Sequence, residues 1–320
     1  HAARGETMSS PRLGIHLLTQ ASNQFFGVPS EERDRQVEVL RSIGITDVKL
    51  LTDSDSQWKA AKWLTEQGFR VIVRFYKPPI ATEAVPDEQL RMFLDAGVVA
   101  VESFINEPCI EWGRPPVASV IDDLAHAHIR FADACGRVGI KPITPAIQGD
   151  RVYTWFEPFV QRVIAIGRRD ALEGSIIGCH PRPVNNLPET APPGFVVRSY
   201  ELFDDVIVKH LGRSLDIYAT EWGYEPGDSQ NNELPKITYT SHAAYNLWLT
   251  QMNYRPCLKA VYYWTWLHDW FDSGWWRGSI EASMPVVNVL KMQHETQPPK
   301  PVESDVWSEE DAEKNIRRWC

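Results

Sequence analysis

Two glutamates at the ends of short apolar runs are the residues of this chain best suited to chemistry. Glu107 lies in Ile-Asn-Glu-Pro at positions 105–108, and Glu221 lies in Ala-Thr-Glu-Trp-Gly at 219–223. Each glutamate is expected just after a β-strand, where an α/β barrel builds its active site. Hydrolysis of a glycosidic bond needs one carboxylic acid and one partner carboxylate. The pair therefore predicts this chemistry and says much less about the substrate.

The elements that must position the two glutamates are predicted from a repeated pattern of helix-like run, glycine and β-branched run. Gly44, Gly68, Gly97 and Gly139 each precede such a β-branched run. Glycine is expected there because it ends a helix in the left-handed conformation. The runs are apolar on both faces, as buried parallel strands are. Strands are predicted over 13–19, 47–51, 70–76, 98–106, 141–147, 176–180, 216–221 and 258–266. Helices are predicted over 30–42, 54–67, 87–96, 117–138, 155–168, 196–210, 239–254 and 285–294.

Eight alternating strand–helix units predict an α/β fold, a (β/α)8 TIM barrel in a single domain. We expect residues 1–12 to form an N-terminal tail and 13–295 the catalytic barrel. Residues 296–320 are expected to form a proline-rich connector and a short C-terminal helix, an appendage lying on the barrel. No Gly-x-Gly-x-x-Gly or P-loop motif follows a predicted strand, which argues against a nucleotide-binding fold.

Composition excludes several classes of function. The formal net charge of −9 argues against nucleic-acid binding, which needs clustered Lys and Arg. No apolar run approaches the roughly 20 residues of a membrane helix. The five cysteines form no Cys-x-x-Cys pair and are expected to be free thiols. The first residues do not resemble a signal peptide, so a cytoplasmic protein and a secreted protein with its signal removed both stay open. The protein is expected to be a monomer.

Three motifs together resemble clan A of the glycoside hydrolases. They are Asn106-Glu107-Pro108 after the fourth predicted strand, Thr220-Glu221-Trp222 after the seventh, and Tyr263-Trp264-Thr265-Trp266 after the eighth. The resemblance covers roughly residues 13–295. It implies a (β/α)8 barrel that hydrolyses β-linked sugars with retention of configuration and needs no cofactor. It also implies that Glu107 is the general acid/base and Glu221 the nucleophile.

The physical chemistry of two close carboxyl groups agrees with this assignment. Retaining enzymes hold their carboxyl groups about 5–5.5 Å apart, so that one of them can attack the anomeric carbon directly. At that distance two negative charges repel each other, and the less stabilised carboxyl group keeps its proton. Glu107 is expected to hold this proton and to pass it to the departing oxygen.

Further substrate-binding residues are expected near the pair, and the same resemblance implies the first two. Asn106 is expected to bond the sugar 2-hydroxyl, and Trp264 to form the floor of the sugar site and to precede a cis peptide bond. Arg74 would hold Glu221 ionised, or lie at the surface as a strand-end arginine. His180, which ends a predicted strand, would touch a sugar hydroxyl or the nucleophile, or be structural. Trp112, Trp266 and Tyr224 are further candidates for sugar contact, with packing as the alternative.

Basic residues at the predicted strand ends raise the question of an anionic substrate. They are Arg74, Lys77, Arg114, Arg151, Arg182 and Arg277. If several point inward, the cleft would favour a carboxylated glycan; the alternative is that they pair with acidic residues on the rim. No metal site is expected, because His126 and His128 lie two residues apart on a predicted helix and face different directions.

The sequence therefore predicts a retaining glycoside hydrolase that acts on an oligo- or polysaccharide. The loops after most predicted strands are short, which favours an open cleft and endo action. Mannan, β-glucan and xylan are the candidate substrates. An exo-acting β-glycosidase is the alternative within the enzyme class, and a barrel that binds carbohydrate without catalysis is the alternative outside it.

Overall fold

The computed structural model of the chain describes residues 10–18, 25–52, 57–75, 85–183, 187, 194, 196–224, 238–267 and 274–296. The predicted connector and C-terminal helix, except for Thr296, lie outside these residues, as does most of the predicted N-terminal tail.

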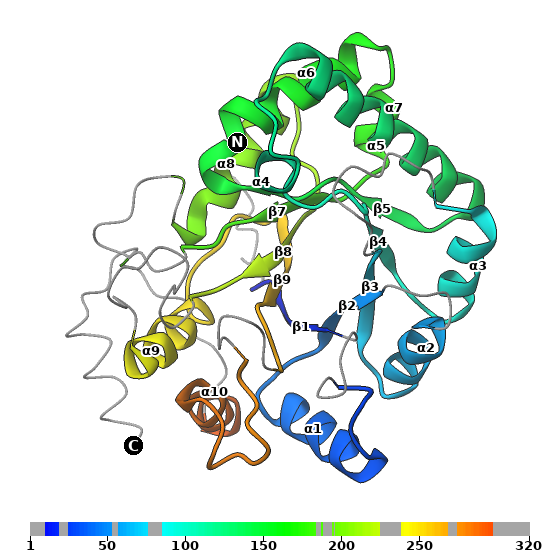
Figure 1. The fold of residues 1–320 in the computed structure, drawn as a ribbon. Coiled ribbons are helices and arrows are strands. Elements are labelled where there is room, and N and C mark those ends of the chain that lie inside the picture. The colour runs from blue at the N-terminus through cyan, green and yellow to red at the C-terminus, as the bar shows by residue number, and fades with distance from the viewer. Residues whose placement is uncertain are drawn as a thin grey trace, which may run out of the picture.

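Nine parallel strands form one curled sheet, consistent with an α/β barrel (Figure 1). The strands are β1 (Arg12–Leu17), β2 (Asp47–Thr52), β3 (Arg70–Phe75), β4 (Ala100–Glu102), β5 (Lys141–Ile143), β6 (Ile147–Gln148), β7 (Ile177–His180), β8 (Ile217–Trp222) and β9 (Leu258–Tyr263). Their order in the sheet is β5-β4-β3-β2-β1-β9-β8-β7-β6. The first and last strands are therefore neighbours, and the carboxyl ends of all strands meet on one face.

The sheet has nine strands instead of the predicted eight because the fifth predicted strand is interrupted. Pro145 separates β5 from β6, and proline has no N–H to donate to a strand ladder. The interrupted segment still pairs with the chain after β4 and with the chain before β7. Ala146 forms an isolated bridge with Asn106, and Ile143 forms one with Ile176.

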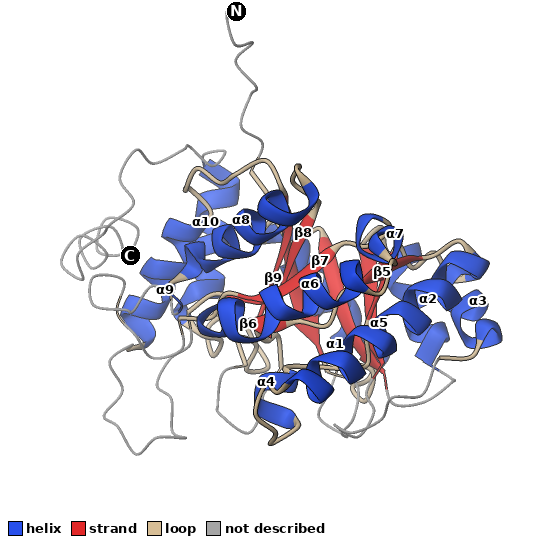
Figure 2. Cartoon of the chain, turned by 90° about the horizontal axis from the view of Figure 1, so that it is seen from above, coloured by secondary structure: helices blue, strands red, loops and turns tan. Residues whose placement is uncertain are grey.

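Helices surround the curled sheet in Figure 1, and Figure 2 shows the same helices and strands from above. They are α1 (Ser30–Ser42), α2 (Trp58–Glu66), α3 (Asp87–Asp95), α4 (Pro108–Glu111), α5 (Ala118–Val138), α6 (Glu157–Ala165), α7 (Arg169–Glu173), α8 (Tyr200–Leu211), α9 (Tyr239–Leu249) and α10 (Pro285–Thr296). A π-helical turn over Val152–Phe156 precedes α6. Within the part of the chain that the structure describes, no helix is long and apolar enough to span a membrane.

A small apolar cluster lies beneath the polar side chains of the sheet interior. It consists of Ile72, Ala100, Ile143, Ile176, Tyr218, Ala260 and Tyr262. Side chains two residues apart on a strand share a face, so the next inward positions are Arg74, Glu102 and Thr220. These three residues are buried and polar. The interior therefore changes from apolar to polar toward the carboxyl ends of the strands, where both glutamates lie.

Gly223 fixes the turn that follows the strand of Glu221. Its φ of +95° lies in the left-handed region, and an added Cβ would lie 2.7 Å from both Asn246 Oδ1 and Tyr263 Cδ1. Asn246 is itself held by hydrogen bonds to the backbone N–H and carbonyl of Tyr224.

We expect the substitution Gly223→Ala to lower the free energy of unfolding by about 2 kcal/mol or more, measured by chemical denaturation. Gly167→Ala is the matched control, because Gly167 also has a positive φ (+84°) but has no atom within 4 Å of an added Cβ. A loss equal to that of the control would show that the crowding around Gly223 costs nothing.

Candidate active site

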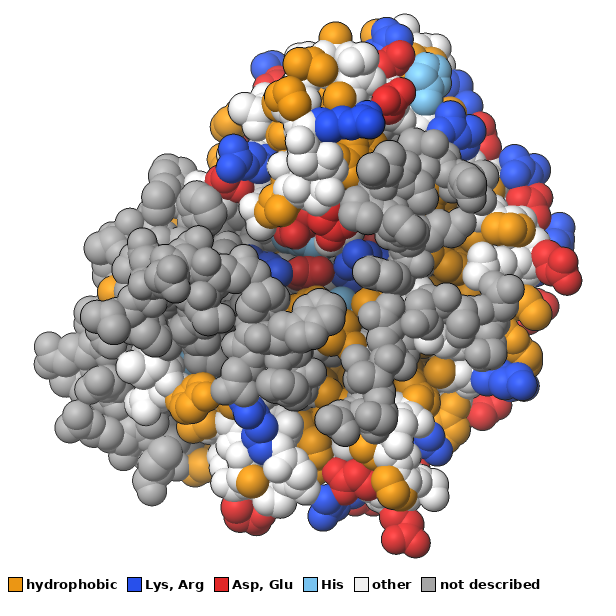
Figure 3. Space-filling model, viewed as in Figure 1, with side chains coloured by type: hydrophobic (Ala, Val, Ile, Leu, Met, Phe, Trp, Pro, Cys, Tyr) orange, Lys and Arg blue, Asp and Glu red, His pale blue; other side chains and the backbone are white. Residues whose placement is uncertain are grey.

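Glu107 and Glu221 come from opposite parts of the sheet and meet in its interior. Glu107 follows β4, and Glu221 is the fifth residue of β8. One carboxylate oxygen of each lies within 4.8 Å of the other and of a ring nitrogen of His180. Acidic, basic and histidine side chains gather in a hollow at the middle of the face seen in Figure 3. The close approach of the two carboxyl groups is the main geometric feature of this site.

Glu221 is surrounded by positive charge. Its Oε2 accepts a hydrogen bond of 2.6 Å from Arg182 Nη1. Its Oε1 lies 3.8 Å from Arg74 Nη1 and 3.9 Å from Lys49 Nζ. Burial by itself would raise the pKa of Glu221, but the charges of His180, Lys49 and Arg182 outweigh burial and hold this pKa well below its usual range. Glu221 is therefore a carboxylate at neutral pH.

Glu107 is held in a defined position by its backbone. It precedes α4 with a left-handed φ of +36°, and its N–H donates to the carbonyl of Ala146 at 3.0 Å. Residues other than glycine seldom adopt this conformation, which clusters at functional sites. The side chain of Glu107 is hydrogen-bonded to that of His180, with 2.8 Å between Glu107 Oε1 and His180 Nδ1.

Arg74 contacts Glu221, His180 contacts both glutamates, and Asn106 directly precedes Glu107 in the chain. His180 Nδ1 lies 3.7 Å from Glu221 Oε2, so the imidazole ring contacts both carboxyl groups. Asn106 Nδ2 donates to Glu111 Oε1 at 2.6 Å. No described residue gives a hydrogen-bond partner to Asn106 Oδ1 or His180 Nε2, although both atoms are buried. Such atoms are usually satisfied by a partner, and a ligand hydroxyl would supply one.

One face of the Trp264 ring lies toward Arg182, which contacts Glu221. The Trp264–Thr265 peptide bond is cis, which confirms the expectation from the sequence. The Arg182 guanidinium lies 5.5 Å from the centre of the Trp264 ring, and His16 packs edge-on against the same ring at 4.7 Å. Trp264 thus borders the charged site and stays partly exposed.

The remaining predicted sugar contacts lie in packed surroundings. Trp266 is fully buried, stacks on Trp276 and donates its indole N–H to Gln36 Oε1 at 2.8 Å. Tyr224 is buried against Tyr245. Trp112 is partly buried and packs against the main hydrophobic core. The structure gives all three residues packing contacts and does not bring them to the two glutamates in the contacts that it describes.

Three buried polar residues of the site were not predicted from the sequence: His16 on β1, Lys49 on β2 and Glu102 on β4. A signal was present, since Lys49 interrupts a strand that is otherwise apolar in its middle, Asp-Val-Lys-Leu-Leu-Thr. Burial, followed by the charge of Lys49, holds the pKa of His16 well below its usual value, so its ring is neutral at neutral pH.

Of the six basic residues that suggested an anionic substrate, two reach the glutamates. These are Arg74 and Arg182, and both contact Glu221. Arg151 pairs with Asp150 at 3.0 Å, Arg277 donates to the carbonyl of Gly274, and Arg114 is exposed. Lys77 lies outside the described residues. The two inward arginines already have an acidic partner in the protein, so their position does not require an anionic substrate.

Among the described residues, Glu107, His180 and Glu221 form a group close enough to hold a metal ion. All three residues already have a hydrogen-bonded atom, because His180 Nδ1 is hydrogen-bonded to Glu107 Oε1 and Glu221 Oε2 accepts from Arg182. A guanidinium 2.6 Å from a carboxylate oxygen would repel a cation at that oxygen. The geometry favours an ion-paired acid–base site over a metal site.

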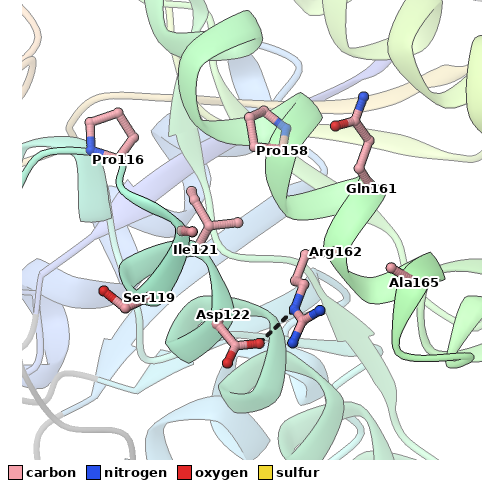
Figure 4. Close-up of a pocket in the computed structure, with 9 residues that line it drawn as sticks. Pro116, Ser119, Ile121, Asp122, Pro158, Gln161, Arg162 and Ala165 are labelled. Atoms are coloured by element: carbon pink, nitrogen blue, oxygen red, sulfur yellow. Dashed lines mark hydrogen bonds and ion pairs between the residues drawn. The ribbon is translucent and has the colours of Figure 1, made fainter.

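A second hollow lies on the outer helices. It is a groove of about 590 Å³ between α5 and α6 (Figure 4). Its lining residues are Pro116, Ala118, Ser119, Ile121, Asp122, Pro158, Gln161, Arg162 and Ala165. Asp122 and Arg162 pair across it at 2.6 Å. The groove shares no residue with the predicted site, and its lining lacks the paired carboxyl groups that hydrolysis requires.

Comparison with known proteins finds similarity in structure and not in sequence. No model of a protein family matches the chain, and no curated protein matches it either. A family 39 glycoside hydrolase from the gut symbiont Bacteroides cellulosilyticus WH2 is similar in structure, with a TM-score of 0.60 and 14% sequence identity. The similarity covers 90% of this chain and 64% of that enzyme, so the chain spans under two thirds of its relative's length.

Two further structures are similar. A family 128 (subgroup I) endo-β-1,3-glucanase from Amycolatopsis mediterranei has a TM-score of 0.52 and 13% identity over 88% of this chain and 98% of that one. Bacteroides uniformis β-glucuronidase 2 has a TM-score of 0.58 and 10% identity over 90% of this chain and 35% of that one. The predicted resemblance to clan A glycoside hydrolases is therefore confirmed at the level of the fold.

Proposed function

We propose that this protein is a retaining glycoside hydrolase that cleaves β-linked glycans by double displacement. The observation that carries the proposal is the approach of Glu107 and Glu221 within 4.8 Å, in two different electrostatic environments. This close approach is consistent with the short carboxyl separation of retaining enzymes, which is smaller than the separation in inverting enzymes.

The geometry supports a distinct role for each glutamate. Glu221, kept ionised by its cationic neighbours, attacks the anomeric carbon and forms a glycosyl ester while the bond to the leaving oxygen breaks. Glu107 gives its proton to that oxygen. Glu107 then takes a proton from water, the water oxygen attacks the anomeric carbon, and the ester bond to Glu221 breaks. His180, which contacts both carboxyl groups, orients them during the two steps.

For the substrate, we propose a neutral β-glucan cleaved within the chain. Trp264 offers an aromatic ring at the edge of the site, and such rings pack against the apolar faces of sugars. Among the similar structures, one is an endo-β-1,3-glucanase and another is Saccharomyces cerevisiae Gas2p in complex with laminaritetraose and laminaripentaose, at a TM-score of 0.53 and 10% identity. That the chain acts as a monomer stays a prediction.

We also propose that the curled sheet is an eight-stranded barrel in which β5 and β6 are two parts of one strand. The bridges of Ile143 to Ile176 and of Ala146 to Asn106 support this interpretation, because they connect the two ends of the strand order.

A screen of β-linked polysaccharides and aryl β-glycosides tests the proposed function. We expect hydrolysis of a β-glucan to oligosaccharides whose new reducing ends are initially β, observed by proton NMR before mutarotation. Initial α products would contradict the retaining mechanism. Release of single sugars from chain ends would favour the exo-acting alternative. Binding of glycans without turnover would favour a non-catalytic carbohydrate-binding barrel.

A further inference from the structure

A lysine lies fully buried beneath the proposed nucleophile. Lys49, on β2, has no exposed surface. Its Nζ lies 2.7 Å from Glu102 Oε2, donates to the backbone carbonyl of Thr220 at 3.1 Å, and lies 3.9 Å from Glu221 Oε1. A buried ammonium group is costly unless it is paired and hydrogen-bonded, and Lys49 meets both conditions.

Lys49 and Glu102 together hold the residue that precedes Glu221. Lys49 binds the carbonyl oxygen of Thr220, and Thr220 Oγ1 donates to Glu102 Oε1 at 2.5 Å. The three side chains come from β2, β4 and β8, so the contacts cross the interior of the sheet. The ion pair therefore fixes the end of β8 from two sides, one residue before the nucleophile.

We propose that Lys49, anchored by Glu102, is a positioning residue that keeps the carboxylate of Glu221 in place and in its charged form. This inference rests on the proposed function, in which Glu221 is the nucleophile. Lys49 is fully buried, so a substrate does not contact it.

Other charged and titratable groups also face Glu221. They are His16 on β1, Arg74 on β3, Glu107 after β4, His180 on β7 and Arg182 after β7. Arg182 keeps 16% of its side chain exposed, at the side of Glu221 where Trp264 lies. Lys49 differs because an ion pair with Glu102 and a hydrogen bond to the carbonyl of Thr220 fix it below the site. Its charge therefore stays beside Glu221 whether or not a substrate displaces Arg182.

The test replaces the ion pair by neutral residues of similar shape in the double variant Lys49→Met/Glu102→Gln. Replacing Lys49 alone would leave Glu102 as an unpaired buried charge and risk misfolding. Loss of the Lys49 charge raises the pKa of Glu221, and loss of the Glu102 charge offsets part of this rise; Lys49 has the larger effect on Glu221. We expect the pKa of Glu221 to rise by about one to three units. It is measured by carbon NMR titration of labelled glutamate, with the signal assigned from Glu221→Gln.

Activity provides a second measurement. With a higher pKa, Glu221 loses its charge at a less acidic pH, so the acidic limb of the kcat/KM profile should move to higher pH. We also expect kcat to fall at least tenfold at neutral pH while KM stays within about threefold, because Lys49 does not touch the substrate. Lys49→Gln/Glu102→Gln is the second variant if the first does not fold.

The control is the double variant Arg12→Met/Asp47→Asn. This ion pair, with 3.0 Å between Arg12 Nε and Asp47 Oδ1, joins β2 to the neighbouring β1 at the amino ends of the strands, whereas Glu221 lies near the carboxyl end of β8. It should lower stability without moving the pKa of Glu221.

An unchanged pKa of Glu221 and an unchanged pH profile in the folded Lys49 variant would overturn the inference. If the wild type turns over no glycan but the Lys49 variant still raises the pKa of Glu221, the proposed function fails and the electrostatic role of Lys49 stands.

Discussion

Replacing Glu221 by glutamine should lower kcat on a β-linked substrate by about 10⁴-fold or more, the size of loss that follows removal of a nucleophile. The amide has nearly the shape of the carboxylate but cannot form the glycosyl ester. Because Arg182 can still donate to the amide oxygen, the site should stay folded and bind glycans with little change. Turnover and calorimetric binding measured on the same variant separate the two effects.

Glu221→Gly provides a stricter version of this experiment. The smaller side chain leaves space for azide, which can attack the anomeric carbon in place of the carboxylate. An activated aryl β-glycoside should then give the α-glycosyl azide, identified by NMR. Glu157→Gln is the control, since Glu157 lies on α6 and pairs with Lys209 and His210 outside the site. Glu221 variants that retain activity within tenfold of the control would contradict the assigned nucleophile.

Replacing Glu107 by glutamine should lower kcat by about 10²–10⁴-fold on natural glycans, the usual contribution of a general acid or base. The loss should depend on the leaving group. A dinitrophenolate departs without a proton, so the first step on dinitrophenyl β-glycosides should proceed at nearly the wild-type rate. The second step would still lack its base, and the glycosyl ester should accumulate on Glu221.

Rapid-quench kinetics checks the role of Glu107 directly. The expected result is a burst of dinitrophenolate equal to the enzyme concentration, followed by slow turnover, together with intact-protein mass spectra that show the added sugar. An equal loss of rate on activated and unactivated substrates would contradict the role of Glu107 as the acid. In that case the contact between Glu107 and His180 would have a structural role instead.

The predictions from sequence that depend on local patterns agree with the structure. Gly44, Gly68, Gly97 and Gly139 all have positive φ, as expected for glycines that end helices. Most helices begin and end within a few residues of the predicted bounds, because caps and apolar spacing are local properties of the chain. The prediction of a continuous fifth strand was wrong because it followed the apolar run and disregarded Pro145, which has no N–H for a strand ladder.

Side-chain contacts were harder to predict because they depend on which face of a strand turns inward. Trp264 and Trp266 are two residues apart in one motif, yet Trp264 borders the charged site and Trp266 packs beneath Trp276. The chain leaves its regular strand at Tyr263 and passes through a cis peptide bond, so strand alternation no longer describes the two rings.

The sequence by itself determined that two glutamates stand at the ends of strands in a repeated α/β pattern, because strand, helix and glycine signals are local. Only the tertiary structure decided that Glu107 and Glu221 lie within 4.8 Å, and that Lys49, Arg74 and Arg182 surround Glu221. These residues come from distant parts of the chain. Curling of the sheet turns them toward one interior, and burial there makes their charges act strongly on one another.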